Sequence, residues 1–182
     1  AATLDIQMIA PLHGPILRED LGYYIGKYLT WSSYEPEEEG ILLAYASIHG
    51  NTRIAAEKMK EFLEQAGAKK VVLMDLSRDD MAQAVANAFR FDKMVLACAT
   101  YDGGLFPCME DFLNHLKAKT YQKRTVALIE NGTWGPVAAK QMRAMLETMK
   151  DITVLEDVVT IRSTVKPENI DQMKALAEQI VK

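Results

Sequence analysis

Tyr45-Ala46-Ser47-Ile48-His49-Gly50-Asn51-Thr52-Arg53 is the most informative segment of the sequence, because it joins an apolar run to a helical pattern through a hydroxyl-rich turn. Backbone N–H groups that converge in such a turn, together with the positive end of the helix dipole, can hold a phosphate without a lysine. We expect the Ser47 and Thr52 hydroxyls and the Asn51 amide to add donors, and Gly50 to allow close approach. The alternative interpretation of the same turn is that Asn51 or Thr52 simply caps the helix.

Two later loops each combine an aromatic residue with glycine. They read Ala99-Thr100-Tyr101-Asp102-Gly103-Gly104-Leu105-Phe106-Pro107 and Glu130-Asn131-Gly132-Thr133-Trp134-Gly135. A flat conjugated ligand needs aromatic faces to stack on and bare backbone to bond its polar edge. Tyr101 and Trp134 are therefore the predicted walls of a binding site, although each can also be an anchor of its own loop.

Short apolar runs alternate with helical patterns from residue 41 onward. The predicted strands are residues 41–46, 70–74, 92–97, 125–129 and 152–159, and the predicted helices are residues 52–66, 79–89, 107–117, 136–149 and 168–181. Nearly continuous apolar strands joined by helices are typical of a parallel sheet that is covered on both faces. The sequence therefore predicts an α/β, doubly wound fold of five parallel strands, with the ligand at the carboxyl ends of the strands.

The first forty residues do not join this pattern. They contain a possible strand at residues 7–10, a turn at residues 11–15 and a possible helix at residues 16–29. Residues 35–40 read Glu-Pro-Glu-Glu-Glu-Gly, and consecutive like charges with Pro and Gly predict a solvated linker. A length of 182 residues fits one domain with such an appendage.

Composition argues against a nucleic acid or a membrane as partner. Net charge is -4 and the basic residues are scattered among acidic ones, so no basic stripe is present. No apolar run reaches the roughly 18 residues that a membrane-spanning helix needs. Cys98 and Cys108 form neither a CxxC pair nor a metal-ligand spacing, which predicts a reduced, cytoplasmic protein. We expect both to be packing residues, with Cys108 in the first turn of a helix, where a thiol pKa can drop.

Taken together, the three loops resemble those of a flavodoxin-like domain, which implies the strand order 2-1-3-4-5 for residues 41–182. In this resemblance the residues that match the FMN phosphate loop are Ser47, Ile48, His49, Gly50, Asn51 and Thr52. The residues that match the two isoalloxazine loops are Thr100, Tyr101, Asp102, Gly103, Gly104, Asn131, Gly132, Thr133 and Trp134.

The N-terminal segment narrows the resemblance to the flavodiiron proteins, also called A-type flavoproteins. Ile9-Ala10-Pro11-Leu12-His13-Gly14-Pro15 resembles the end of that family's metallo-β-lactamase-like domain, and Tyr28-Leu29-Thr30-Trp31-Ser32 resembles its lead-out helix. The resemblance makes residues 1–40 a remnant of that domain plus a linker, and residues 41–182 the FMN-binding domain. It makes His13 a diiron ligand of the intact parent only, because the other ligands are absent here.

The resemblance also implies a function for the parent protein. Non-covalently bound FMN takes electrons from a rubredoxin-like or flavin reductase donor and passes them to a diiron centre that reduces O2 or NO. The parent is expected to be a head-to-tail homodimer in which one subunit's FMN faces the other's irons. We do not expect this chain by itself to reduce O2 or NO.

Three loop residues carry more specific expectations. Asp102 beside the flavin is expected to oppose negative charge on the reduced ring and so to lower its potential. Gly103 and Gly104 can let a peptide flip and accept a hydrogen bond from the reduced N5–H group. His49 stands where flavodiiron proteins often carry Tyr or Trp, and both contact with the cofactor and simple exposure stay open for it.

Other functional classes also fit parts of this pattern. A receiver-type signalling domain shares the topology, but it needs an acidic cluster after the first strand and an Asp at the end of the third, where this chain has Ala44-Tyr45-Ala46-Ser47 and Cys98-Ala99-Thr100. An FMN-dependent NAD(P)H:quinone reductase needs a nicotinamide site, usually built from loop insertions that are absent here. A structural domain that has lost its cofactor is the third alternative.

Overall fold

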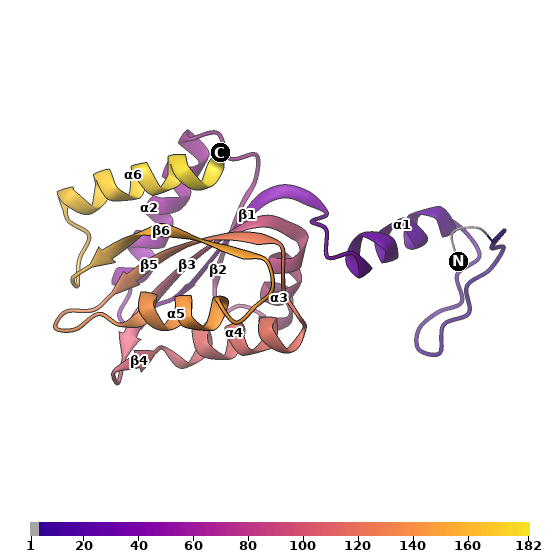
Figure 1. Ribbon diagram of the computed structural model, residues 1–182, viewed down its shortest axis with the longest axis horizontal. Helices are drawn as coiled ribbons and strands as arrows, with labels where there is room; N and C mark the ends of the chain where they lie inside the picture. The colour runs from indigo at the N-terminus through magenta and orange to yellow at the C-terminus, as the bar shows by residue number, and fades with distance from the viewer. Residues whose placement is uncertain (1–3) are drawn as a thin grey trace.

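A sheet of six strands forms the centre of the structure (Figure 1). The computed structural model describes residues 4–182, so the first three residues of the predicted N-terminal segment lie outside it. The strands are β1 Glu38–Ala46, β2 Val71–Asp75, β3 Phe91–Tyr101, β4 Gly104–Leu105, β5 Arg124–Asn131 and β6 Ile152–Ile161. Five of them run parallel in the order β2-β1-β3-β5-β6, and the short β4 pairs antiparallel with β3. The predicted doubly wound fold and its strand order are confirmed, with β4 as an addition.

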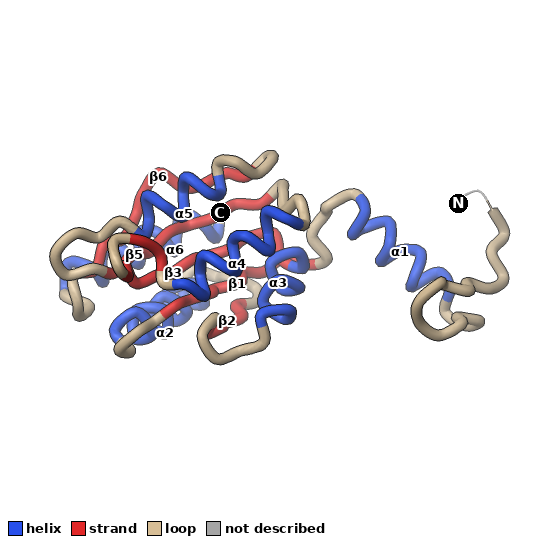
Figure 2. Tube along the Cα trace, turned by 90° about the horizontal axis from the view of Figure 1, so that it is seen from below, coloured by secondary structure: helices blue, strands red, loops and turns tan. Residues whose placement is uncertain are grey.

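Helices cover both faces of the sheet (Figure 2). They are α2 Asn51–Gln65, α3 Met81–Arg90, α4 Pro107–Ala118, α5 Ala138–Leu146 and α6 Pro167–Val181. Buried side chains of α2 and α6 pack on one face, and those of α3, α4 and α5 pack on the other. The three consecutive helices α3, α4 and α5 therefore share one face, and α2 and α6 share the other. Because β1, β3, β5 and β6 run parallel, the loops that follow them lie at one edge of the sheet.

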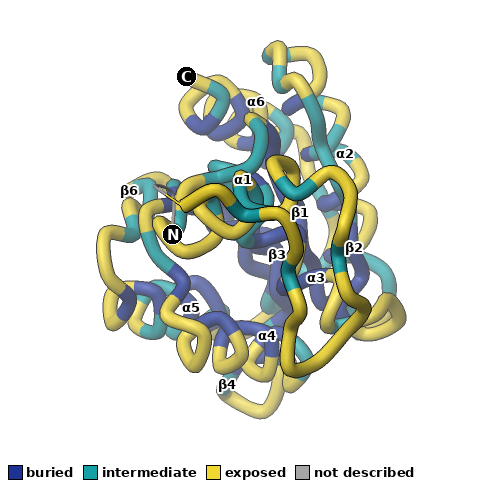
Figure 3. The backbone as a smooth tube through the Cα atoms, turned by 90° about the vertical axis from the view of Figure 1, so that its right-hand side faces the viewer, coloured by how far each residue is buried: buried dark blue, intermediate teal, exposed yellow. Residues whose placement is uncertain are grey.

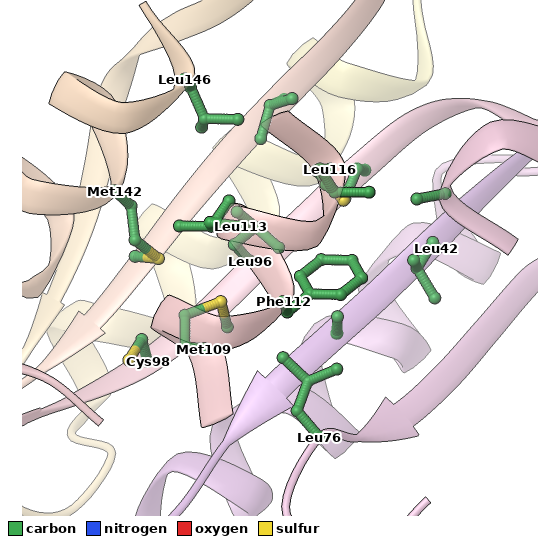
Figure 4. Packing of buried hydrophobic residues seen from close by; sticks show 14 of the residues in the cluster. Leu42, Leu76, Leu96, Cys98, Met109, Phe112, Leu113, Leu116, Met142 and Leu146 are labelled. Carbon is green, nitrogen blue, oxygen red and sulfur yellow. The ribbon is translucent and has the colours of Figure 1, made fainter. Parts of the chain in front are cut away.

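The core is divided by the sheet, and the buried strands run through the middle of the molecule (Figure 3). Successive residues of β1 alternate between the two layers, because side chains along a strand point to opposite faces. Leu42 contributes to the cluster under α3, α4 and α5, and Leu43 contributes to the cluster under α2 and α6. Figure 4 shows the first cluster, in which Phe112 of α4 and Met142 of α5 point toward the strands. Among the described residues, no helix is both long and apolar enough to cross a membrane.

An arm formed by the N-terminal residues projects away from the sheet (Figures 1 and 2). It carries helix α1, Leu21–Ser32, which has no buried residue within the described part of the chain. The predicted helix at residues 16–29 therefore begins too early, because Leu17 forms an isolated antiparallel bridge with Ile9 instead. The possible strand at residues 7–10 is reduced to that single bridge.

The last three residues of the predicted linker belong to β1, so that part of the prediction is wrong. Their charges are compensated by cations from neighbouring elements: Glu38 forms ion pairs with Lys70 and Arg90. The Gly40 N–H group donates to the Asp92 carboxylate at 2.8 Å. These partners are distant in sequence, so a local pattern of acidic residues cannot reveal them.

The predicted loops are also shorter than expected. Strand β3 continues through Tyr101 and β5 through Asn131, so the beginnings of both predicted ligand loops are strand. Helix α5 begins at Ala138 rather than at Pro136, because the backbone of Val137, with φ of -131°, is not helical.

Candidate functional site

A cleft of about 390 Å³ opens at the carboxyl ends of β1, β3, β5 and β6. Its size is within the range of about 300–1,000 Å³ that is typical of small-molecule sites. The residues that line it are Ser47, Ile48, His49, Asn51, Thr52, Ala99, Thr100, Gly103, Asn131, Gly132, Thr133, Trp134, Gly135 and Ser163. The structure thus brings most of the predicted site residues together from three separate loops.

Some predicted residues do not line this cleft, and some lining residues were not predicted. Gly50, Tyr101, Asp102 and Gly104 belong to the same turns but are not part of the cleft wall. The residues that sequence reasoning missed are Ala99, Gly135 and Ser163.

Helix α2 presents an open N-terminus to the cleft. The first N–H groups of an α-helix have no partner within the helix, and a capping side chain normally accepts from one of them. Here the N-cap is Gly50, with φ of 92°, and it has no side chain to offer. The Ser47 hydroxyl accepts from the Gly50 N–H at 3.1 Å and fixes the turn one step before the helix. The alternative that Asn51 or Thr52 caps the helix is wrong, since both lie inside it.

Thr52 provides a free hydroxyl in this open turn. Its exposed fraction is 1%, it lines the cleft, and its hydroxyl makes no hydrogen bond to any residue in the range 4–182. A buried hydroxyl normally finds a partner, so one that opens onto a cleft is suited to an external acceptor. Arg53 is exposed, and its Nε atom lies 3.6 Å from Glu57 Oε1 on the same helix.

The N-terminus of α5 also lies at this edge, but side chains of the sheet close it. The Thr100 hydroxyl accepts from the backbone N–H groups of Val137 at 3.1 Å and Ala138 at 3.3 Å. The Glu130 carboxylate accepts from Ala139 N–H at 2.9 Å and from the Thr160 hydroxyl at 2.9 Å. Of the two helix termini, α2 is therefore the one that can receive an anion.

The connection between β3 and β4 is a two-residue hairpin turn. Asp102 and Gly103 occupy its centre with φ of 48° and 69°, which is the conformation of a type I′ turn that Asp-Gly favours. Tyr101 lies just before this turn and packs against Phe106, with ring centroids 5.6 Å apart. Tyr101 does not line the cleft in this structure, so it does not form the predicted wall. The Gly103 carbonyl accepts from Gln141 Nε2 at 3.0 Å.

The loop after β5 forms the opposite wall. A β-carbon at Gly132 would lie 2.9 Å from Pro136 Cα and 3.1 Å from Thr100 Oγ1, so this close packing needs glycine. Trp134 is 96% exposed, which means that almost none of its ring packs on the protein. A tryptophan in that state beside a cleft is available to a ligand.

Ser163, in the loop after β6, adds a fourth segment to the site. Its N–H group donates to Asn131 Oδ1 at 3.1 Å, and its carbonyl accepts from Asn131 Nδ2 at 2.9 Å. The Asn51 amide donates to the Ser163 hydroxyl at 3.4 Å. The two hydrogen bonds with Asn131 thus hold Ser163 at the cleft, in the left-handed backbone conformation with φ of 68°. Nothing local in the sequence around Ser163 signals this, because its partners come from other loops.

Burial raises the pKa of three side chains near the carboxyl ends of β1 and β3, which keeps them neutral at ordinary pH. Burial raises the pKa of the Cys98 thiol to about 12. Burial, and next the charge of Asp75, raise the pKa of Tyr45 to about 12. Burial also raises the pKa of Cys108, so the expectation of a lowered thiol pKa there is wrong.

The three histidines of the chain take no part in a metal cluster in the described residues. His13 is exposed in the arm, and no group of three or more His, Cys, Asp or Glu side chains that could hold a metal occurs between residues 4 and 182. His49 is exposed at the rim of the cleft, so the structure gives it access to a ligand there.

Comparison with known families decides the identity of this domain. The profile of the flavodoxin domain matches residues 42–161. The chain belongs to the flavodoxin domain family. Within that range the profile covers the open turn and both aromatic-bearing loops of the cleft.

Relatives of this flavodoxin domain include flavodiiron proteins. An anaerobic nitric oxide reductase flavorubredoxin of Vibrio vulnificus is 24% identical over 144 residues, which cover 79% of this chain and 29% of that protein. Rubredoxin oxygen:oxidoreductase of Desulfovibrio gigas matches with a TM-score of 0.89 and 19% identity, over 96% of this chain and 43% of that one. The flavodiiron protein of Giardia intestinalis matches with a TM-score of 0.84 and 19% identity, over 98% of this chain and 44% of that one. The chain therefore has a flavodoxin-like fold similar to that of flavodiiron proteins, and it spans less than half the length of each of these relatives.

Proposed function

We propose that this chain is the FMN-binding, electron-transfer part of a flavodiiron protein. The observation that carries the proposal is a single cleft that joins the open N-terminus of α2 to the exposed ring of Trp134. FMN has the same two parts, a phosphate and a flat conjugated ring. Membership of the flavodoxin domain family supports this choice of ligand.

The residues present fit the phosphate of FMN. The first N–H groups of α2 and the Thr52 hydroxyl are neutral donors that have no partner among residues 4–182. An anion at a helix N-terminus gains about 0.3–1 kcal/mol from the helix dipole in addition to its hydrogen bonds. Ser47 and Gly50 hold the turn open, and the Asn51 amide donates to the Ser163 hydroxyl, which joins the turn to the loop after β6.

The residues around the other half of the cleft fit the ring. FMN, when bound, supplies the capacity to accept and release one or two electrons. Trp134 would provide a stacking face, while Gly103, which has open space where a β-carbon would be, leaves room for the ring to approach the backbone. The neutral thiol of Cys98 and the neutral Tyr45 phenol beneath the cleft add no charge to the site.

The wider setting belongs to the same proposal. We infer that residues 1–40, of which the last three begin β1, are the end of a metallo-β-lactamase-like domain with its linker, which is supported by structural matches over 96% and 98% of this chain. In the parent, His13 would be an iron ligand, a rubredoxin-like or flavin reductase protein would donate electrons, and O2 or NO would accept them. A homodimer and a cytoplasmic location complete the proposal, and the free state of Cys98 and Cys108 supports the latter.

Titration of the apoprotein with FMN tests the proposal. We expect one FMN per chain and strong quenching of flavin fluorescence, because the ring stacks on Trp134. A Trp134→Leu variant should bind more weakly and quench less, whereas a Trp31→Leu variant, altered in the arm, should behave as the wild type. A protein that neither copurifies with FMN nor binds it when added would contradict the proposed function.

A further inference from the structure

Gln141 connects helix α5 to the hairpin turn between β3 and β4. Its Nε2 atom donates to the Gly103 carbonyl oxygen at 3.0 Å. A β-carbon at Gly104 would lie 3.6 Å from Gln141 Oε1, so the amide of Gln141 also packs against the next residue of the turn. The Gln141 side chain is thus in contact with the Gly103–Gly104 peptide.

Gly103 is the residue of this turn that lines the cleft, whereas Asp102 and Gly104 do not. The two central residues both have positive φ, as a type I′ turn requires, and glycine leaves the peptide at 103–104 free to take other conformations. The hydrogen bond from Gln141 therefore favours the observed orientation of the Gly103 carbonyl, in addition to the pairing of Gly104 with Tyr101.

The helix that carries Gln141 is itself held in place. Thr100 and Glu130 bond the first N–H groups of α5, so its N-terminal turn is fixed to β3 and β5. Gln141 lies one turn further along this helix. The turn at residues 102–103 follows β3, and Gln141 lies on a helix whose first turn is bonded to β3 and β5. The position of Gln141 relative to the turn is therefore fixed by the sheet.

We propose that Gln141 is a positioning residue that keeps the Gly103 carbonyl bound to α5 and so withholds it from reduced FMN. This inference depends on the proposed function. Reduction by an external electron donor, with uptake of a proton from water, makes the flavin N5 a hydrogen-bond donor. A backbone carbonyl that turned to accept from it would favour the reduced state, and Gln141 opposes that turn. The structure accordingly assigns to Gln141 the effect of lowering the first reduction potential.

Spectroelectrochemical titration of FMN-loaded protein tests this assignment. In Gln141→Met the side-chain length is kept and the donor is lost. We expect reduced FMN to bind about fivefold more tightly relative to oxidised FMN, the effect of one neutral hydrogen bond, which corresponds to a rise of about 40 mV in the one-electron potential. The control is Gln65→Met, on an exposed position at the end of α2, which should leave the potential unchanged.

The possible results distinguish the role of Gln141 from the proposed function. An unchanged or lowered potential in Gln141→Met, with FMN still bound, overturns the role of Gln141 and leaves the proposed function intact. Failure of the wild type to bind FMN overturns both. If Gln141→Met does not fold, crystals of the oxidised wild-type complex decide: a Gly103 carbonyl within hydrogen-bond distance of Gln141 Nε2 supports the role, and a carbonyl turned into the cleft refutes it.

Discussion

Replacement of Thr52 by valine separates phosphate binding from folding. The Thr52 side chain is 1% exposed, and its hydroxyl has no partner among residues 4–182. Valine has nearly the same shape and also tolerates a helix, so Thr52→Val removes a donor that the protein itself does not use. The free energy of unfolding of the apoprotein should stay the same or rise by up to about 1 kcal/mol, because no internal hydrogen bond is lost.

Binding of FMN should respond very differently. A hydrogen bond to a charged group contributes about 1.5–3 kcal/mol, so the dissociation constant of FMN should increase by about 10- to 150-fold. Riboflavin has the same ring without the phosphate, and its affinity should not change. Fluorescence titration with both ligands measures the two constants on the same protein samples.

A matched control makes this comparison sharper. Thr148→Val removes an exposed hydroxyl that donates to the Met145 carbonyl at 2.7 Å, away from the cleft. It should leave both affinities unchanged. Equal losses of FMN and riboflavin affinity in Thr52→Val, or no loss of either, would refute the placement of the phosphate at α2.

Four further predictions concern other parts of the structure. Gly132→Ala should lower the free energy of unfolding by about 1–3 kcal/mol in chemical denaturation, because its methyl group would meet Pro136 at 2.9 Å. Asp102→Asn should raise the second-electron potential of bound FMN only slightly, because the exposed charge of Asp102 is screened by solvent. Asn also suits the left-handed conformation of the turn. A fall in that potential would contradict the expected effect of the charge. Arg124→Met should lower the free energy of unfolding by about 3–5 kcal/mol, because the buried guanidinium donates to several backbone carbonyls. It should not change FMN affinity, because Arg124 lies at the amino-terminal edge of the sheet, opposite the cleft. With its pKa raised by burial to about 12, Cys98 should stay unreactive toward a thiol reagent at pH 8 in the folded protein and react only after unfolding.

The sheet could be predicted from the sequence because its signal is local. Runs such as residues 41–46 are apolar on both faces, and each helix that follows has its own periodic pattern and breaker. The open turn at 47–52 was recognisable for the same reason, since strand, turn and helix are contiguous there. Boundaries were less predictable, and β1 starts at Glu38 because Lys70 and Arg90 neutralise it from other elements.

Details of the site were hidden because they depend on contacts between loops. Ser163 is held at the cleft by its hydrogen bonds with Asn131. The Thr100 hydroxyl already accepts a hydrogen bond from the N-terminus of α5. Neither contact leaves a trace in the residues next to it in sequence. The role of Gln141 also appears only when α5 is placed beside the hairpin turn.

A crystal structure of the chain with FMN would show directly whether the phosphate binds at α2. We predict that the phosphate lies within hydrogen-bond distance of the first N–H groups of α2 and of the Thr52 hydroxyl, with the ring against Trp134. A phosphate bound elsewhere, with the N-terminus of α2 still open to solvent, would contradict it.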